Sequence, residues 1–476
     1  MVNYKELGFK CGLEIHQQLE GHKLFCNCPC IIKDDKPDFE VKRNLRVSAS
    51  ELGEFDPAAL YELQKGKYFV YQGYNDVNCL IELDEEPPKE LNKTALNIAL
   101  QVALLLNAKP VDVIQFMRKI VIDGSNVSGF QRTALVAING YIETSEGKIS
   151  ISSICLEEES AKKIEDKESY RVYNISRLGI PLIEIATGPE IKSAEGAKEA
   201  AEKIGMVLRS VKGVKRGLGS IRQDINLSVK GQSRVEIKGF QDLRSIPKVV
   251  EYEVNRQLEL LNKNEKLKSE VRKAESNFTT SFLRPMPGAS RMYPETDVPL
   301  INIDKKLLEK IELPKLLDEK VKYLEEKYKL QSDIAREIIK EGIDFEGFVK
   351  DYRNIEPGFI ARLLIEIPKE ISSRFNLNIS KLEDQSYFHI VLEAISEGKI
   401  KKDAALDILV DLIRNEKIDL SKYKTVSDKE LEEEIKKICE KNKGVPFGGL
   451  MGEVMKKFRG KVDGKKVADI IKKYGK

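Results

Sequence analysis

Four short segments of this chain have the residue pattern of β-strands, and each carries an acidic residue; three of the four alternate apolar and polar residues. Successive side chains of a β-strand point to opposite faces, so such segments bury their leucines and isoleucines and leave polar residues on the open face. If the strands share one sheet, the acids and a histidine gather on that face, where they repel each other unless a cation lies among them. The pattern therefore predicts a metal site. The segments are GLEIH (12–16), PLIEI (181–185), IRQDINL (221–227) and VEIK (235–238), and the alternation places Glu14, His16, Asp224 and Glu236 on the open face.

A run of three glutamates (157–159) ends a fifth predicted strand, which begins at Lys148. Such a triplet is normally solvated. If the alternation continues to the end of the strand, however, Glu158 lies on the other face of the strand from Glu157 and Glu159. Glu158 then becomes a further contributor to the acidic face. A site with more carboxylates than one ion needs can hold two ions, or ions together with the polyphosphate of ATP. This favours phosphoryl transfer, in which positioning and charge neutralisation supply most of the catalysis.

The hydrophobic periodicity changes near residue 299. Before it, short apolar strands separated by turns mix with amphipathic helices at 94–106, 194–211 and 246–261. This predicts an α+β domain (1–298) with a largely antiparallel sheet and peripheral helices. After it, helical periodicity predicts an all-helical C-terminal region, divided into a helical domain (299–405) and a basic helical tail (406–476). Helix breaks are expected at Gly342, Pro357, Pro368 and Gly398.

The charge of the chain is nearly balanced, with a net charge of +3, so any surface for nucleic acid must be local. The last 36 residues hold 11 Lys and Arg against 3 Asp and Glu. Such a stretch predicts binding to the phosphate backbone of a nucleic acid. The alternative is a solvated surface helix without a partner. The chain begins without an apolar leader segment and has no apolar run of 18 residues, so we expect a cytoplasmic protein with no membrane span.

Three of the seven cysteines, Cys26, Cys28 and Cys30, form a cluster. A zinc site is one interpretation, but a second CxC or CxxC pair is missing, so reduced and partly buried thiols are favoured. The chain also lacks the GxxxxGK[ST] phosphate loop and the HExxH zinc motif.

Five segments occur in the order and spacing of the GatB/GatE family, the kinase and transamidase subunits of tRNA-dependent amidotransferases. They are GLEIH (12–16), LEEE (156–159), RLGIPLIEI (177–185), RQDIN (222–226) and VEIK (235–238). Four longer strings resemble the archaeal E branch of this family rather than the bacterial B branch. These are DEEPP (84–88), RKIVIDGSN (118–126), KRGLGS (215–220) and SRMYPETD (290–297).

The resemblance implies that residues 1–298 form the family's cradle-shaped domain. It further implies that the domain uses ATP and Mg²⁺ to phosphorylate the γ-carboxyl of glutamate misacylated on tRNA(Gln), after which ammonia displaces the phosphate. By motif, the metal ligands would be Glu14, His16, Glu158, Glu184, Asp224 and Glu236, and the catalytic candidates Glu158, Glu184 and Arg222. The residues that would bind the ATP phosphates or the acyl-adenosine end are Arg118, Lys119, Ser125, Asn126 and Arg222. For each basic residue, ion pairing to a nearby carboxylate is the alternative. His16 binds a metal only as a neutral imidazole, so metal binding should fail at acid pH.

No glutaminase motif surrounds any cysteine and no Ser–Lys amidase signature is present, so ammonia should come from another chain. In the archaeal family this is an asparaginase-like D subunit, which implies a hetero-oligomer. Archaeal members of the E branch also carry a synthetase-like domain before the segment RPMP (284–287), whereas residues 268–280 bridge that place here. Two alternatives remain: a B-type subunit acting on Asp-tRNA(Asn) and Glu-tRNA(Gln), and a non-catalytic tRNA-binding assembly factor.

Overall fold

The computed structural model describes residues 3–49, 53–240, 242–288, 292–414, 423, 428–442, 444–458 and 464–474. The chain divides into two compact units, Met1–Leu316 and Leu317–Lys476. Each unit is described by itself.

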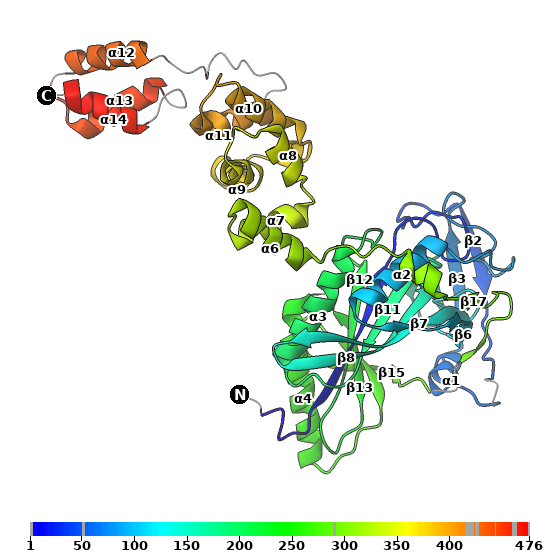
Figure 1. Ribbon diagram of the computed structural model, residues 1–476. Helices are drawn as coiled ribbons and strands as arrows, with labels where there is room; N and C mark the ends of the chain where they lie inside the picture. The colour runs from blue at the N-terminus through cyan, green and yellow to red at the C-terminus, as the bar shows by residue number, and fades with distance from the viewer. Residues whose placement is uncertain are drawn as a thin grey trace. The chain divides into compact units, whose positions relative to one another are not determined.

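An eleven-stranded sheet forms the centre of the first unit (Figure 1). Its strands follow the order β15-β14-β13-β12-β1-β11-β8-β7-β6-β16, and β4 pairs with β7 outside this path. Neighbouring strands are antiparallel except for β13 and β14, which are parallel. The strands are β1 (Lys10–Gln18), β4 (Lys109–Pro110), β6 (Phe116–Ile120), β7 (Phe130–Thr144), β8 (Gly147–Glu158), β11 (Pro181–Thr187), β12 (Ile221–Ser228), β13 (Val235–Phe240), β14 (Glu270–Ala274), β15 (Thr280–Pro285) and β16 (Met292–Pro294).

Three helices cover one face of this sheet: α2 (Lys93–Leu105), α3 (Ala194–Ser210) and α4 (Ile246–Asn262) (Figure 1). The main core lies between them and the sheet, where Ile15, Ile185 and Ile225 are fully buried. Ser193 caps the N-terminus of helix α3, where its hydroxyl accepts a hydrogen bond from the Gly196 amide. The alanines of α3 allow close packing on the strands. Because the helices take the apolar face, the polar face of the sheet remains available for a site.

Smaller elements flank the main sheet. A four-stranded sheet has the order β2-β3-β10-β9, and a two-stranded sheet joins β5 to β17. Their bounds are β2 (Phe39–Arg43), β3 (Tyr68–Gly73), β5 (Val113–Ile114), β9 (Lys162–Asp166), β10 (Tyr170–Asn174) and β17 (Ile301–Asn302), and the short helices are α1 (Pro57–Leu63), η1 (Leu243–Ser245) and α5 (Lys305–Glu309).

Among its described residues, the second unit contains helices and no strands. One hydrophobic cluster is built from α6 (Leu317–Tyr328), α7 (Ser332–Glu341), α8 (Phe345–Asp351), α9 (Pro357–Phe375), η2 (Ser380–Glu383), α10 (Ser386–Ser396), η3 (Lys402–Ala404) and α11 (Ala405–Arg414). A separate cluster joins α12 (Asp428–Lys441), α13 (Phe447–Phe458) and α14 (Gly464–Tyr474). The predicted α+β domain followed by a helical region is therefore confirmed.

The expected break at Pro368 is wrong, because α9 continues through this residue. Proline removes one backbone hydrogen bond and costs about 3 kcal/mol in a helix interior. Here Leu364, Ile367 and Ile371 lie on both sides of it and are buried in the cluster. Each buried side chain of this size contributes about 1.5–3 kcal/mol, so their packing outweighs the cost of the proline.

Candidate active site

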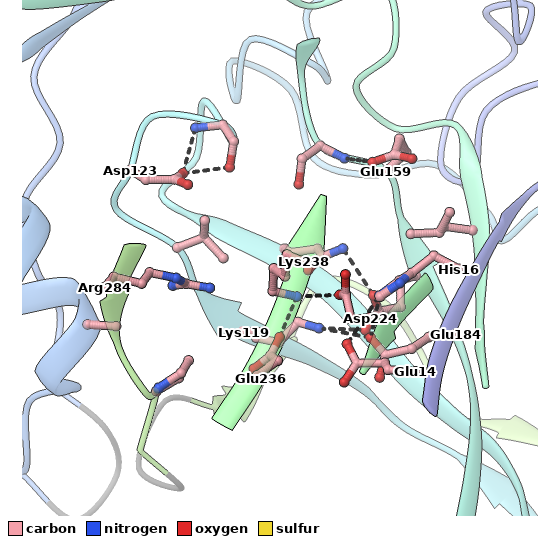
Figure 2. Close-up of a pocket in the computed structure, with 18 of the residues that line it drawn as sticks. Glu14, His16, Lys119, Asp123, Glu159, Glu184, Asp224, Glu236, Lys238 and Arg284 are labelled. Atoms are coloured by element: carbon pink, nitrogen blue, oxygen red, sulfur yellow. Dashed lines mark hydrogen bonds and ion pairs between the residues drawn. The ribbon is translucent and has the colours of Figure 1, made fainter. Parts of the chain in front are cut away.

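Strand β1 lies near the centre of the large sheet and brings the predicted acids together. It pairs with β11 and β12, and the register sets His16 opposite Glu184 and Glu14 opposite Asp224. On the next strand, Glu236 lies opposite Asn226 of β12. Residues directly opposite each other in a sheet share a face, so these five side chains project from the face that the helices leave open (Figure 2).

The five side chains line a cavity of about 550 Å³. Basic residues complete its wall. Lys119, Lys238 and Arg284 come from β6, β13 and β15 (Figure 2). Arg222 comes from β12. A cavity of this size falls in the range of sites that bind cofactor-sized molecules. Its mixture of carboxylates and cations suits a polyphosphate carried by a divalent cation.

His16 lies at the centre of the acidic cluster. Its Nε2 atom is 3.3 Å from Glu14 Oε1 and 3.3 Å from Glu184 Oε2. Burial disfavours the charged ring, but hydrogen bonds and charges from the two carboxylates outweigh it and raise the pKa of His16 to about 10. In the absence of another cation, the imidazole is therefore protonated at neutral pH and neutralises part of the cluster.

Two overlapping groups of residues bring their ligand atoms within 4.8 Å of one another. One group is Glu14, His16 and Asp224, and the other is His16, Glu157 and Glu184. Carboxylate oxygens are the ligands that Mg²⁺ prefers, and it usually keeps several waters. The donor set therefore fits a divalent cation, with His16 available to both groups.

Two lysines lie against these carboxylates. Lys119 Nζ is 2.7 Å from Glu157 Oε1 and 3.6 Å from Glu184 Oε2. Lys238 forms ion pairs with Asp224 and Glu236; burial works against its charge, but the two carboxylates outweigh burial and raise its pKa. The sequence interpretation missed Lys238, although the alternation along VEIK had placed it on the same side as Glu236.

Glu158 lies outside the cavity, contrary to expectation, because β8 contains a bulge. Its register against β11 shifts by one residue, so that Ser153 pairs with Ala186 and Ile151 with Thr187. Ser152 is then the extra residue, and an extra residue reverses the alternation of faces.

Burial along β8 shows the reversal directly. Ile149 and Ile151 are buried before the bulge, and Ile154 and Leu156 after it. Glu157 and Glu159 consequently line the cavity. Glu158 Oε2 instead lies 3.3 Å from Arg132 Nη1 in a buried ion pair.

Glu159 fixes one of the predicted basic residues at the cavity wall. Arg222 Nη2 lies 2.7 Å from Glu159 Oε2, and the Gln18 side-chain amide donates to the same oxygen at 2.9 Å. The Arg222 guanidinium is therefore held in position while 30% of its side chain remains exposed.

The other four residues expected to bind ATP separate into two pairs. Lys119 and Ser125 line the cavity. Arg118 instead forms two hydrogen bonds to Glu295, at 2.9 and 2.6 Å, which is the ion-pair alternative. Asn126 is buried and accepts a hydrogen bond from the Ser160 hydroxyl at 3.0 Å.

Comparison with known proteins identifies the family of the chain. Residues 9–309 match the GatB/GatE catalytic domain, and residues 343–474 match the GatB domain. The first match alone covers more than half of the chain. The chain belongs to the GatB/GatE family.

Within the GatB/GatE family, the chain is similar to archaeal proteins named as the E subunit of glutamyl-tRNA(Gln) amidotransferase. The protein from Methanocaldococcus jannaschii is 40% identical over 625 aligned positions, which cover 99% of both chains. Those from Archaeoglobus fulgidus and Methanococcus maripaludis are each 37% identical, over 99% of this chain and 99% and 98% of their own length. The resemblance to the E branch is thereby confirmed.

The length of this alignment bears on the expected absence of a domain. It spans 625 positions, whereas this GatB/GatE chain has 476 residues, so at least 149 positions (625 minus 476) have no counterpart here. In the structure, β14 and β15 pair as an antiparallel hairpin at the expected place of that domain. The difference in length agrees with the absence of one domain-sized insertion.

Among the described residues of the chain, no helix combines the length and the apolar character needed to cross a membrane.

Proposed function

We propose that this chain is the subunit of a tRNA-dependent amidotransferase that activates the glutamyl γ-carboxyl of Glu-tRNA(Gln) with ATP and converts it to the amide. The observation that carries the proposal is the cavity on the open face of the sheet, where carboxylates, His16 and lysines converge. A pure tRNA-binding protein needs no such set. The names of its relatives in the archaeal E branch supply the substrate. We place the protein in the cytoplasm, where aminoacyl-tRNA is used.

The metal ligands in this proposal are the acidic residues and the histidine that the cavity brings together. Glu157 takes the role first given to Glu158, since only Glu157 lies in a ligand group. Bound Mg²⁺ would neutralise the phosphates and orient the γ-phosphoryl group. The proposed ligand set is Glu14, His16, Glu157, Glu184, Asp224 and Glu236.

Three cationic side chains and one hydroxyl of the cavity would hold ATP and stabilise the charge that develops on the phosphates. Lys119, Ser125, Arg222 and Lys238 all line the cavity and can donate to phosphate oxygens. A γ-carboxylate oxygen of the substrate attacks the γ-phosphorus of ATP, and ADP leaves. Ammonia then attacks the acyl carbon, and phosphate leaves with the bonding electrons.

Ammonia comes from a partner subunit, which we propose to be an asparaginase-like D subunit. An acyl phosphate hydrolyses in water, so ammonia that arrives through a protected path gives a clear advantage. We expect no glutaminase activity from this chain alone, measured as glutamate released from glutamine. Release by the isolated chain would contradict the assignment of ammonia production to a partner.

Reconstitution with misacylated tRNA tests the function as a whole. The full chain, Glu-tRNA(Gln), ATP, Mg²⁺ and ammonium chloride should yield Gln-tRNA(Gln) and ADP without a second protein. Asp-tRNA(Asn) is the control substrate, because its conversion would favour a B-type specificity. Binding of Glu-tRNA(Gln) without any ADP formation would support the non-catalytic alternative and overturn the proposal.

Affinity for Mg²⁺ should rise with pH. Below the raised pKa of His16, about 10, the ring is protonated and a metal must displace that proton. Displacing one proton increases the apparent affinity by about tenfold per pH unit. Calorimetric titration between about pH 7 and about pH 9 measures this slope, and His16→Asn removes the titrating group and should flatten it.

Basic residues of the tail should contribute to tRNA binding. Lys441, Lys456 and Lys472 are exposed on α12, α13 and α14. Replacing all three by alanine should weaken tRNA binding and lower its salt slope by up to about 0.9 for each phosphate that is no longer neutralised. Filter binding over a salt series measures both quantities. A control triple variant that removes the same charge replaces exposed lysines of α6–α8, namely Lys322, Lys340 and Lys350. If both triple variants weakened tRNA binding equally, the tail would not be a specific part of the tRNA interface.

A further inference from the structure

One arginine of the cavity has no acidic partner. Lys119, Arg222 and Lys238 each form an ion pair with a carboxylate of the cavity wall. Arg284 also lines the cavity, and its guanidinium group points into it (Figure 2). Among the described residues, however, no carboxylate lies within ion-pairing distance of Arg284. An arginine that faces a cavity without a carboxylate is available to bind an anionic group of a ligand.

Strand register places Arg284 away from the acidic cluster. Arg284 pairs with Val271 of β14, and Val271 pairs with Glu236 of β13. In the strand order of the sheet, β15 lies four strands from β1, which carries Glu14 and His16. At about 4.8 Å per strand, this separation is about 19 Å along the sheet. An anion bound by Arg284 is therefore a different group from the phosphate that the acidic cluster and its metal would hold.

Helix α1 borders the same part of the cavity and supports an exposed aromatic ring. Glu62 of α1 lines the cavity, as Arg284 does. The neighbouring Tyr61 contacts Phe282 of β15 edge to face, with ring centroids 6.4 Å apart. One face of the Tyr61 ring is covered by the ammonium group of Lys65, 4.5 Å from the centroid, whereas Phe282 is 51% exposed. Phe282 is thus held from the side and remains open to a ligand.

An exposed aromatic ring close to an unpaired arginine suits single-stranded nucleic acid. A base stacks on the ring, and a phosphate of the strand pairs with the cation. A triphosphate carries several charges and is bound with a divalent cation, as at the acidic cluster. A phosphodiester carries one charge, which a single arginine can neutralise. Phe282 and Arg284 lie two residues apart on β15, which is close enough for one nucleotide to contact both.

We propose that Phe282 and Arg284 bind the terminal adenosine of the aminoacyl-tRNA, Phe282 by stacking on its adenine and Arg284 by pairing with its 5′ phosphate. The inference rests on the proposed function, because that function brings the 3′ end of a tRNA to this cavity. The glutamyl group is esterified to the ribose of this nucleotide, so its γ-carboxyl would extend from the β15 edge toward the acidic cluster. The adenine of ATP is the competing source of a base.

Binding of uncharged tRNA(Gln) to the full chain tests the stacking contact. Phe282→Ala should weaken binding of intact tRNA(Gln) by about 5–150-fold, the range for one lost base–aromatic stack. It should not change binding of the same tRNA shortened by its 3′-terminal CCA. Phe278→Ala is the matched control, since it removes another exposed phenylalanine from the turn of the same hairpin. Equal affinity of the wild-type chain and a folded Phe282→Ala variant for intact tRNA would overturn the proposal.

The phosphate contact has its own signature in the salt dependence of binding. Arg284→Gln should lower the slope of log K against log salt concentration by about 0.7, the value for one phosphate of a single strand. Arg362→Gln removes the same charge from an exposed position on α9 and should leave the slope unchanged. An unchanged slope in Arg284→Gln would contradict the pairing of Arg284 with a phosphate.

A fluorescent base reports the stack directly in the wild-type chain. With 2-aminopurine in place of the terminal adenine of tRNA(Gln), stacking on Phe282 should quench the emission, and Phe282→Ala should restore it. Calorimetric titration with ATP separates the competing source. If Phe282→Ala lost affinity for ATP and bound intact tRNA as the wild-type chain does, the ring would hold the adenine of ATP and the proposal would be wrong.

These binding measurements need no turnover, so they are independent of the test of the proposed function. If reconstitution gave no ADP while Phe282→Ala still lost the CCA-dependent part of tRNA binding, the site for the 3′ end would stand and the proposed reaction would fall. If reconstitution succeeded while Phe282→Ala and Arg284→Gln both bound intact tRNA as the wild-type chain does, only the assignment of this site would fall.

Discussion

Replacing Glu184 by glutamine is expected to lower tRNA-dependent ATP hydrolysis by about 10²–10³-fold, the loss typical when one preorganised electrostatic group is removed from an active site. Glu184 belongs to one ligand group and contacts both His16 and Lys119. Burial opposes its charge, but Lys119 and His16 outweigh burial and hold the pKa of Glu184 well below its usual range. The glutamine keeps the shape of the side chain and removes only the charge that a metal and the two cations require.

ADP release in the presence of Glu-tRNA(Gln) and Mg²⁺ measures this effect, and tRNA binding should be largely retained. Glu190→Gln is a control of the same chemistry at an exposed position on the segment after β11. A second comparison uses the two neighbouring glutamates of β8. Glu157→Gln should lose activity as Glu184→Gln does, whereas Glu158→Gln should keep it, since Glu158 faces Arg132. If Glu158→Gln lost activity and Glu157→Gln kept it, Glu158 would be the metal ligand. Unchanged turnover in Glu184→Gln would refute the metal assignment.

Glu295→Gln is expected to destabilise the first unit by about 3–5 kcal/mol, the cost of removing one partner from a buried ion pair. The Glu295 side chain has no exposed surface. It accepts hydrogen bonds from Arg118 at 2.6 Å and from Arg132 Nε at 2.7 Å. The amide would remove the carboxylate that the two guanidinium groups share and, among the described residues, leave Arg118 only Asp297 and Arg132 only Glu158 as acidic partners. The Arg132 side chain is only 7% exposed, so this loss falls on a buried charge.

Calorimetric unfolding of the full chain measures this loss in the transition of the first unit. Glu90→Gln is the control, because the Glu90–Lys93 pair is almost fully exposed and should change stability by less than about 0.5 kcal/mol. Burial opposes ionisation of Glu295, but Arg118 and Arg132 outweigh it and lower its pKa. Its contribution is therefore present above the unfolded pKa of about 4.3 and is lost as the pH falls through the folded value. A wild-type stability equal to that of Glu295→Gln at neutral pH would contradict this account.

The sequence by itself determined the class of fold and most of the acidic face. Strand alternation has a period of two, so Glu14, His16, Asp224 and Glu236 could be assigned to the polar side of their strands without a structure. The same alternation failed at Glu158, because a bulge near Ser152 depends on how β8 pairs with β11. The helix break predicted at Pro368 was wrong for a related reason, because packing of the helical core outweighs the tendency of proline to end a helix.

Only the tertiary structure decided which side chains meet. It turned Glu157 and Glu159 into the cavity, placed Lys238 between Asp224 and Glu236, and paired Arg118 with Glu295 outside it. It also joined Cys79 and Glu82 to the CxC segment, where no second cysteine pair follows in the sequence. The physical reason is the same in each case. Periodicity along a segment specifies the face on which a side chain lies, whereas contacts between distant segments depend on strand register and packing.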